Sequence, residues 1–99
     1  MPTFICLVNW TDQAAKHPTE STKRAQAVRQ IAEKVGGKLL SAYVTTGQYD
    51  AIATFEMPDG DAMIKAVTAL NALGNHRTTT VRALTPEEFS KLASQAPKP

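Results

Sequence analysis

The fold is decided by the central segment KLLSAYVTTGQYDAIATF, residues 38–55. Its first half is rich in Tyr, Val and Thr, and the residues after Asp50 alternate small and larger apolar side chains. A glycine-containing break between two such runs is typical of a β-hairpin, and Gly47 is expected to take a positive φ there. Tyr49 and Asp50 follow the break, where a turn alone has no need of a phenol. The hairpin therefore indicates the fold and is also a candidate functional segment.

Apolar residues on both sides of this hairpin recur at helical or strand spacing. Ser21 is predicted to cap a helix that ends at Gly36-Gly37, and Pro58-Asp59-Gly60-Asp61 precedes a second helix that ends at Gly74-Asn75. Gly47 and Gly74 are the expected structural turn residues. The other expected elements are strands at residues 3–10, 38–46, 51–55 and 77–84 and a loop at residues 11–19.

The C-terminal segment carries its own start signal, Thr85-Pro86-Glu87-Glu88. Thr85 is the predicted N-cap of a short last helix, and Glu88 would close a capping box. Phe89 and Leu92 are expected to hold that helix against the domain. Residues 94–99 contain two prolines and no periodicity, so a single domain at residues 1–93 followed by a disordered tail is expected.

The order β-α-β-β-α-β is that of an α+β, ferredoxin-like domain: a four-stranded antiparallel sheet with both helices on one face, plus the short C-terminal helix. The other face would be uncovered, although strands 3–10 and 38–46 are apolar on both sides. A second copy packed sheet to sheet is the simplest cover, so a homodimer is expected. The alternative is that the last helix folds back. In the first strand, one face is predicted to carry Phe4, Cys6, Val8 and Trp10, and the other Ile5 and Leu7. In the second strand, one face is predicted to carry Leu39 and Tyr43, and the other Leu40, Ala42 and Val44.

The composition excludes several classes of protein. The 99 residues carry a net charge of only +2, with eleven Lys and Arg residues interspersed among acids, so no nucleic-acid partner is expected. No run approaches the roughly 18 apolar residues of a membrane span, and no signal peptide is visible. The single cysteine, Cys6, forms no internal disulfide and is expected to be buried. A cytoplasmic location is the expectation.

Residues that could carry chemistry are few. His17 and His76 have no partner at ligand spacing, so neither a metal nor a cofactor is expected. Tyr49 and Asp50 are either a turn in which Asp50 caps backbone amides or a proton-handling pair in a pocket. Strand alternation places Arg77 and Thr79 on one face, either as a solvated edge or as a site for an anion. On this strand, Arg77, Thr79 and Val81 are predicted to share one face, and Thr78, Thr80 and Arg82 the other.

Several short segments together span roughly residues 2 to 93. They are Val8-Asn9-Trp10-Thr11-Asp12-Gln13, Ser21 with Lys23-Arg24-Ala25, Gly36-Gly37-Lys38, Gly47-Gln48-Tyr49-Asp50, Pro58-Asp59, Leu73-Gly74-Asn75, Arg77-Thr78-Thr79-Thr80, Arg82-Ala83 and Glu88-Phe89. As a set they resemble the GYD-domain family of small bacterial and archaeal proteins. The resemblance implies a dimeric α/β barrel and no established reaction. Thr22 and His76 depart from the family pattern, and the second departure speaks against a shared catalytic base.

The resulting hypothesis is a protein of unknown biochemical function that forms a small homo-oligomer and binds a small polar or anionic molecule. The expected ligand residues are Trp10, Tyr49, Asp50, Arg77 and Thr79. One alternative is a cofactor-free enzyme, oxygenase-like or isomerase-like, in which Asp50 or His76 takes a proton and Arg77 stabilises an oxyanion. Another is a structural or regulatory interaction module whose dimer surface is its function.

Overall fold

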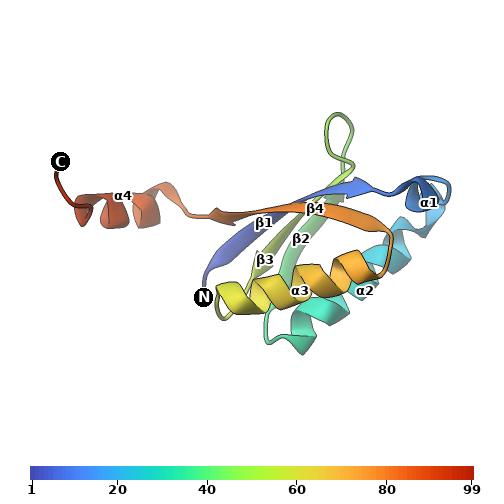
Figure 1. Ribbon diagram of the computed structural model, residues 1–99, viewed down its shortest axis with the longest axis horizontal. Coiled ribbons are helices and arrows are strands. Elements are labelled where there is room, and N and C mark those ends of the chain that lie inside the picture. Colours follow the sequence, from blue (N-terminus) through green and yellow to red (C-terminus); the bar gives the residue numbers. More distant parts are fainter.

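The computed structural model describes residues 1–99 and consists of one four-stranded sheet with helices against one side (Figure 1). In chain order the elements are β1 (Thr3–Trp10), α1 (Asp12–Ala15), the 3-10 helix η1 (Pro18–Glu20), α2 (Ser21–Lys34), β2 (Lys38–Val44), β3 (Ala51–Glu56), α3 (Gly60–Ala72), β4 (His76–Ala83) and α4 (Pro86–Ser94). No helix is both long enough and apolar enough to pass through a membrane.

The strands lie in the order β2-β3-β1-β4, and every neighbouring pair is antiparallel. This confirms the predicted α+β fold with a four-stranded antiparallel sheet. Helices α2 and α3 lie on the same side of the sheet (Figure 1). We call the side with Cys6 and Phe55 the covered face, and the side with Ile5, Leu7 and Ile52 the open face.

The hydrophobic core lies between the covered face and the two long helices. Phe55, Met57 and Cys6 are its largest fully buried side chains. Helix α3 contributes Met63, Ala66 and Leu70, and α2 contributes Ala32. The apolar stripes predicted for both helices therefore face the sheet, and Val28, Ile31 and Val35 pack at the margin of this core.

The turn residues behave largely as expected. Gly47 and Gly74 have φ values of +107° and +82°, a backbone region that residues with a Cβ rarely adopt. Gly37 is required for a different reason, namely close packing. A Cβ added there would collide with the Met57 sulfur and lie 2.7 Å from the Glu56 carbonyl oxygen.

Strand β2 differs from the prediction because it contains a β-bulge. Leu39 is opposite Phe55 and Ser41 is opposite Thr54, so Leu40 is the extra residue. The bulge resets the alternation along the strand: Leu39 is buried beside Phe55, and Ala42, opposite the buried Ala53, shares the covered face. The predicted pairing of Leu39 with Tyr43 on one face was therefore wrong, and Tyr43 lies on the open face opposite Ile52.

The segment between β1 and α2 is also more ordered than the predicted loop. Thr11 caps the short helix α1, because its Oγ1 accepts the Ala14 N–H at 3.3 Å. The 3-10 helix then runs directly into α2. Ser21 was wrongly predicted as the N-cap: its backbone N–H donates to the Pro18 carbonyl, and its Oγ also donates to that carbonyl at 2.7 Å. The residue at the cap position, Glu20, makes no side-chain cap bond.

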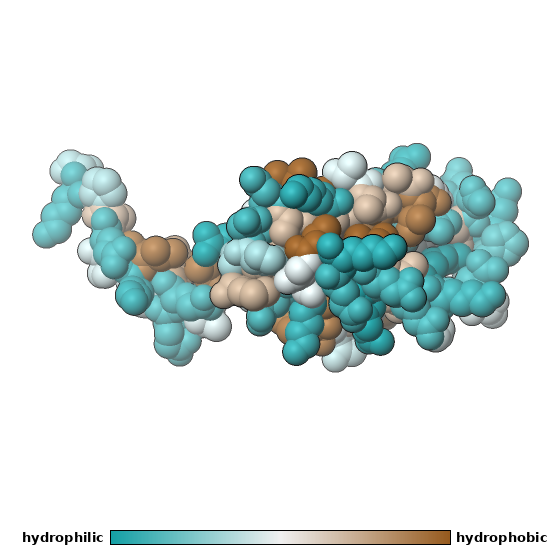
Figure 2. All heavy atoms as spheres, turned by 90° about the horizontal axis from the view of Figure 1, so that it is seen from below, coloured by the Kyte–Doolittle hydropathy of each residue, from teal (hydrophilic) through white to brown (hydrophobic).

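Helix α4 begins as predicted but does not pack on the domain. Thr85 and Glu88 form the full capping box, with bonds of 3.0 and 3.1 Å. The helix projects away from the body as an extension of β4 (Figure 1), and hydrophobic atoms are visible along it in Figure 2. Phe89 is 61% exposed and Leu92 49% exposed, so the prediction that they hold the helix against the domain was wrong. We call residues 84–94 the α4 arm.

Candidate functional site

A cavity of about 110 Å³ lies between α2 and the covered face of the sheet. Most of its walls are apolar, including Val28 of α2 and Phe55 of β3. Its mouth lies along β2, where Ala42 and Val44 line the cavity but are exposed. The polar residues in its lining are Ser21, Arg24, His76 and Thr78. A concave, mostly apolar space with a few polar groups is the usual form of a small-molecule site.

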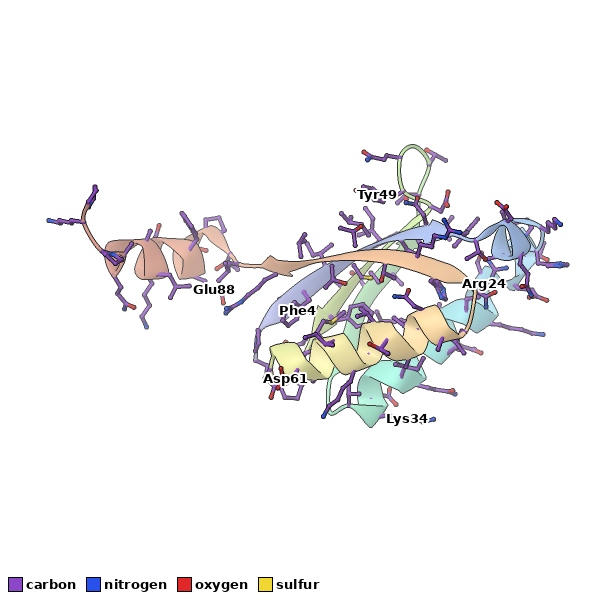
Figure 3. All side chains as sticks on the ribbon, in the orientation of Figure 1. Phe4, Arg24, Lys34, Tyr49, Asp61 and Glu88 are labelled. Atoms are coloured by element: carbon purple, nitrogen blue, oxygen red, sulfur yellow. The ribbon has the colours of Figure 1, made fainter.

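Arg24 occupies one end of this cavity. It lies one turn into α2 and is only 9% exposed (Figure 3). Its Nη2 donates to the carbonyl oxygens of Ala14 at 2.8 Å and His17 at 2.7 Å, which lie at and just beyond the end of α1. Both carbonyls also accept a backbone N–H, that of Ala14 from His17 at 3.1 Å and that of His17 from Glu20 at 3.1 Å, so the guanidinium adds a second hydrogen bond to each and joins this turn to α2. The Nη1 atom is buried and has no hydrogen-bond partner in the protein.

His76 lies across the strand pair from Trp10, at the start of β4. The His76 side chain is 8% exposed, and its Nδ1 has no hydrogen-bond partner. Burial lowers the pKa of His76 below its ordinary value, and the positive charge of Arg24 lowers it further, while a hydrogen bond with the Leu70 backbone acts in the opposite direction. The folded environment therefore favours the neutral imidazole over the charged form.

Trp10 lies next to both of these groups. The Arg24 Cζ lies 5.5 Å from the centre of the Trp10 ring, within the range of a cation–π contact. The backbone of Trp10 is fixed in turn by Asp50, whose carboxylate accepts the Trp10 N–H at 2.9 Å. The aromatic face is thus held in place by the strand and by the hairpin.

Cys6 lies on the cavity floor and is fully buried. Burial raises the pKa of the Cys6 thiol, although hydrogen bonds from Thr80 and Thr78 partly offset this effect. The Thr80 hydroxyl donates to Cys6 Sγ at 3.8 Å. A thiol is a nucleophile only as the thiolate, so this environment suits a structural cysteine. No cluster of three or more His, Cys, Asp or Glu side chains is arranged to hold a metal ion.

The five ligand residues predicted from the sequence do not come together. Trp10 lines the cavity, but Tyr49 and Asp50 do not. Tyr49 lies at the base of the β2–β3 loop (Figure 3), where its carbonyl accepts the Thr45 hydroxyl at 2.7 Å. The Asp50 N–H donates to the Val8 carbonyl at 2.8 Å. These bonds are those of the structural alternative, in which Asp50 organises backbone amides.

Arg77 and Thr79 lie on the opposite side of the sheet from the cavity. They are exposed on the open face, opposite Asn9 and Leu7 of β1. The next residue along, Thr78, faces α3 and exchanges a hydrogen bond with Asn71 at about 3.2 Å. An anion site at Arg77 and Thr79 would therefore be separate from the cavity by the thickness of the sheet.

Sequence reasoning missed Arg24 as a site residue and considered His76 only as a base. The signal for Arg24 was present in the helix pattern. Arg24 stands four residues before Val28, within the same stripe as the apolar residues that face the sheet. A charged residue at an apolar position of an amphipathic helix indicates a buried polar contact. The acceptors at Ala14 and His17 could not be foreseen because the ordered turn that presents them was predicted as a loop.

Comparison with known protein families gives one match that spans most of the chain. A family model described as the GYD domain matches residues 4–93. This chain belongs to the GYD-domain family. A curated relative from Thermus thermophilus is 31% identical over 85 residues, which are 85% of this chain and 90% of that protein. Its name is "Glutamine synthetase and cystathionine beta-lyase binding protein".

Solved structures share the fold of this GYD domain. A crystal structure of a Thermus thermophilus protein has a TM-score of 0.57 at 23% identity and covers 86% of this chain and 95% of its own. A crystal structure of an FFRP protein has a TM-score of 0.62 at 19% identity, covering 85% of this chain and all of the other. Likeness at these identities concerns the α+β fold alone.

Proposed function

We propose that this GYD domain is a homodimeric binding module that holds another protein, rather than a catalyst of its own reaction. The observation that carries the proposal is the pair of apolar surfaces left uncovered on one chain. These surfaces are the open face of the sheet and the exposed side of the α4 arm. A cytoplasmic location, in keeping with the free thiol of Cys6, is part of the same proposal.

The open face has the character of an interface. Val81 is 44% exposed and Tyr43 69% exposed, and Ile5, Leu7 and Ile52 are only half-buried between them. Apolar side chains from all four strands thus lie on a surface that the helices do not cover. Monomers rarely expose patches of this kind, and sheet-to-sheet packing with two-fold symmetry would close it as a dimeric α/β barrel.

The direction of the α4 arm favours a second copy of the chain, rather than the chain's own last helix, as the cover of the open face. The chain passes directly from β4, which ends at Ala83, into a helix that starts at Pro86. That short connection directs the arm beyond the sheet (Figure 1), so Phe89 and Leu92 cannot cover their own open face. In the proposed dimer each arm lies over the partner subunit, where those two side chains become buried.

The kind of protein bound is proposed from the curated relative. Its name gives binding to glutamine synthetase and to cystathionine β-lyase, and the aligned region covers most of both chains. We extend this to the present chain: its partner is a larger enzyme of that kind, held by the outer surface of the dimer. No residue of the present chain is assigned to that contact.

Light scattering coupled to size-exclusion chromatography tests the dimer. The wild type should have twice the mass of one chain at micromolar concentration, and Val81→Asp should have the mass of one chain. Ile64→Asp is the control, because Ile64 is also an exposed aliphatic residue but lies on α3, away from the open face. A wild-type mass equal to one chain would contradict the dimer, as would equal effects of both substitutions.

Protein binding is tested with purified enzymes rather than with a lysate. Glutamine synthetase and cystathionine β-lyase from the same organism as the chain are immobilised in turn, and the wild type is titrated by biolayer interferometry. Saturable binding of at least one enzyme with a dissociation constant of about 10 μM or tighter is expected. Absence of saturable binding to both enzymes at 100-fold higher concentration would overturn the binding-module proposal while leaving the dimer intact.

A further inference from the structure

The cavity beneath α2 contains two buried hydrogen-bonding nitrogens that the fold itself does not use. Arg24 Nη1 and His76 Nδ1 are both fully enclosed and have no hydrogen-bond partner. Both side chains are more than nine-tenths buried, and both line the cavity. Leaving a buried polar group unpaired is costly, so two such groups in the lining of a single cavity indicate a ligand that satisfies them.

The charge of this site selects an anion. The guanidinium of Arg24 stays protonated at every relevant pH, and its two internal bonds go to neutral carbonyl oxygens. No acidic side chain is among the residues that line the cavity. A buried charge without a counterion is expensive, and a carboxylate is the group whose geometry best matches a guanidinium.

The size and walls of the cavity limit the rest of the ligand. An apolar cavity of about 150 Å³ holds benzene, so about 110 Å³ accommodates roughly four or five non-hydrogen atoms. Thirteen of the seventeen lining residues are hydrophobic, which disfavours a strongly hydrated ion such as phosphate. A short alkyl chain on the anion would instead lie against Val28 and Phe55.

We propose that this cavity binds a small monocarboxylate together with one proton: the carboxylate oxygens accept hydrogen bonds from Arg24 Nη1 and from His76 Nδ1, which gains its proton from solvent as the anion binds, and the apolar end enters the space beneath α2. Trp10 holds the guanidinium at a fixed position by its cation–π contact, and Asp50 holds Trp10. The exposed edge at Ala42 and Val44 is the entrance. This site is independent of the proposed protein partner.

Propionate, with five non-hydrogen atoms, is the probe, and uncharged propionamide of the same shape is its control. Titration of the full chain by two-dimensional NMR in carboxylate-free buffer at constant chloride should give saturable shifts at α2 and β4. We expect a dissociation constant of about 1 mM or tighter for propionate and at least tenfold weaker binding of propionamide. Equal binding of the two compounds, or shifts that rise linearly without saturation, would overturn the proposal, because water alone would then satisfy the two nitrogens.

Variants locate the binding within the cavity. Arg24→Met should weaken propionate binding at least tenfold, whereas Arg29→Met, on an exposed position of the same helix, should leave it unchanged. Because Arg24 also bonds to Ala14 and His17, its loss can unfold the chain. Ala42→Leu keeps both nitrogens and narrows the entrance at an exposed position, so it should weaken propionate binding at least fivefold. An unchanged affinity in Ala42→Leu would overturn the cavity as the site.

Discussion

The two faces of the sheet are built from the same strands yet differ in what covers them. On the covered face, Cys6 and Phe55 are almost completely enclosed by α2 and α3. On the open face, Ile5 and Leu7 are only half-buried, and Tyr43 is exposed. The composition of β4 barely distinguishes the faces, since threonine occurs on both. The difference teaches that the burial of a strand residue depends on where the helices lie. Strand alternation shows only which side chains share a face of the sheet.

The comparison predicts its largest effect for loss of an aromatic ring. Phe55→Ala should lower the free energy of unfolding by about 3–5 kcal/mol, because a fully buried ring leaves a cavity that the core cannot close. Tyr43→Ala, on the open face, should cost less than about 1 kcal/mol in the monomer. Urea denaturation at a concentration below that of self-association measures both. Equal costs would show that the open face is packed within a single chain.

A smaller effect is expected at the glycine that precedes β2. Gly37→Ala should lower the free energy of unfolding by about 1–3 kcal/mol, because the new methyl group collides with the Met57 side chain and the Glu56 carbonyl. Gly60→Ala, in the first turn of α3, meets nothing within 4 Å and should be neutral or slightly stabilising. Thermal melts of the two variants compare them directly. A stable Gly37→Ala variant would mean that Met57 can move aside.

The N-caps of α3 and α4 sharpen the comparison between packed and projecting elements. Asp59 Oδ1 accepts the Ala62 N–H at 2.8 Å, and Thr85 Oγ1 accepts the Glu88 N–H at 3.1 Å. Asp59→Ala should cost about 1 kcal/mol of global stability, since α3 unfolds with the core. Thr85→Ala should leave the urea midpoint unchanged and speed amide exchange in the α4 arm alone. A lowered midpoint in dilute Thr85→Ala would show that the arm packs on its own domain.

The smallest effect concerns pH and the covered face. Burial and the charge of Arg24 lower the pKa of His76 in the folded chain below its ordinary value of 6.5. The unfolded chain therefore binds a proton at higher pH than the folded chain, and stability should fall as the pH decreases from 6.5 toward the folded pKa. Urea midpoints measured across that window should fall less in His76→Gln than in the wild type. His17→Gln, at an exposed position, should keep the full decline.

Much of the fold could be predicted because local signals agree with the tertiary structure. The glycine break at Gly47, the cap at Asp59 and the capping box at Thr85 each fix one chain reversal or helix start. What could not be predicted depends on long-range contacts. The bulge at Leu40 is set by how β2 aligns with β3, and the direction of α4 is set by where β4 ends.

The candidate site was less accessible from the sequence than the fold. Trp10 was recognised because a tryptophan at a strand end is conspicuous, whereas Arg24 lies within a helix rich in other charged residues. Its burial depends on carbonyl groups of a segment that has no periodicity of its own. Arg77 attracted attention because it stands in a threonine-rich strand. Neighbouring residues of a strand point to opposite faces, so Arg77 lies on the open face and His76, one residue earlier, lies on the covered face with the cavity.

The extra residue in β2 also bears on how the chain behaves when it is crowded. Strand β2 forms one edge of the sheet, and a regular edge presents a row of free N–H and C=O groups to which a foreign strand can add. At Leu40 two residues of β2 oppose one of β3, which interrupts that row and bends the strand. Deletion of Leu40 would straighten the edge while leaving Leu39 opposite Phe55 and Ser41 opposite Thr54, so that every side chain after it keeps its face. The bulge therefore guards the chain against growth into fibres as well as shaping its core.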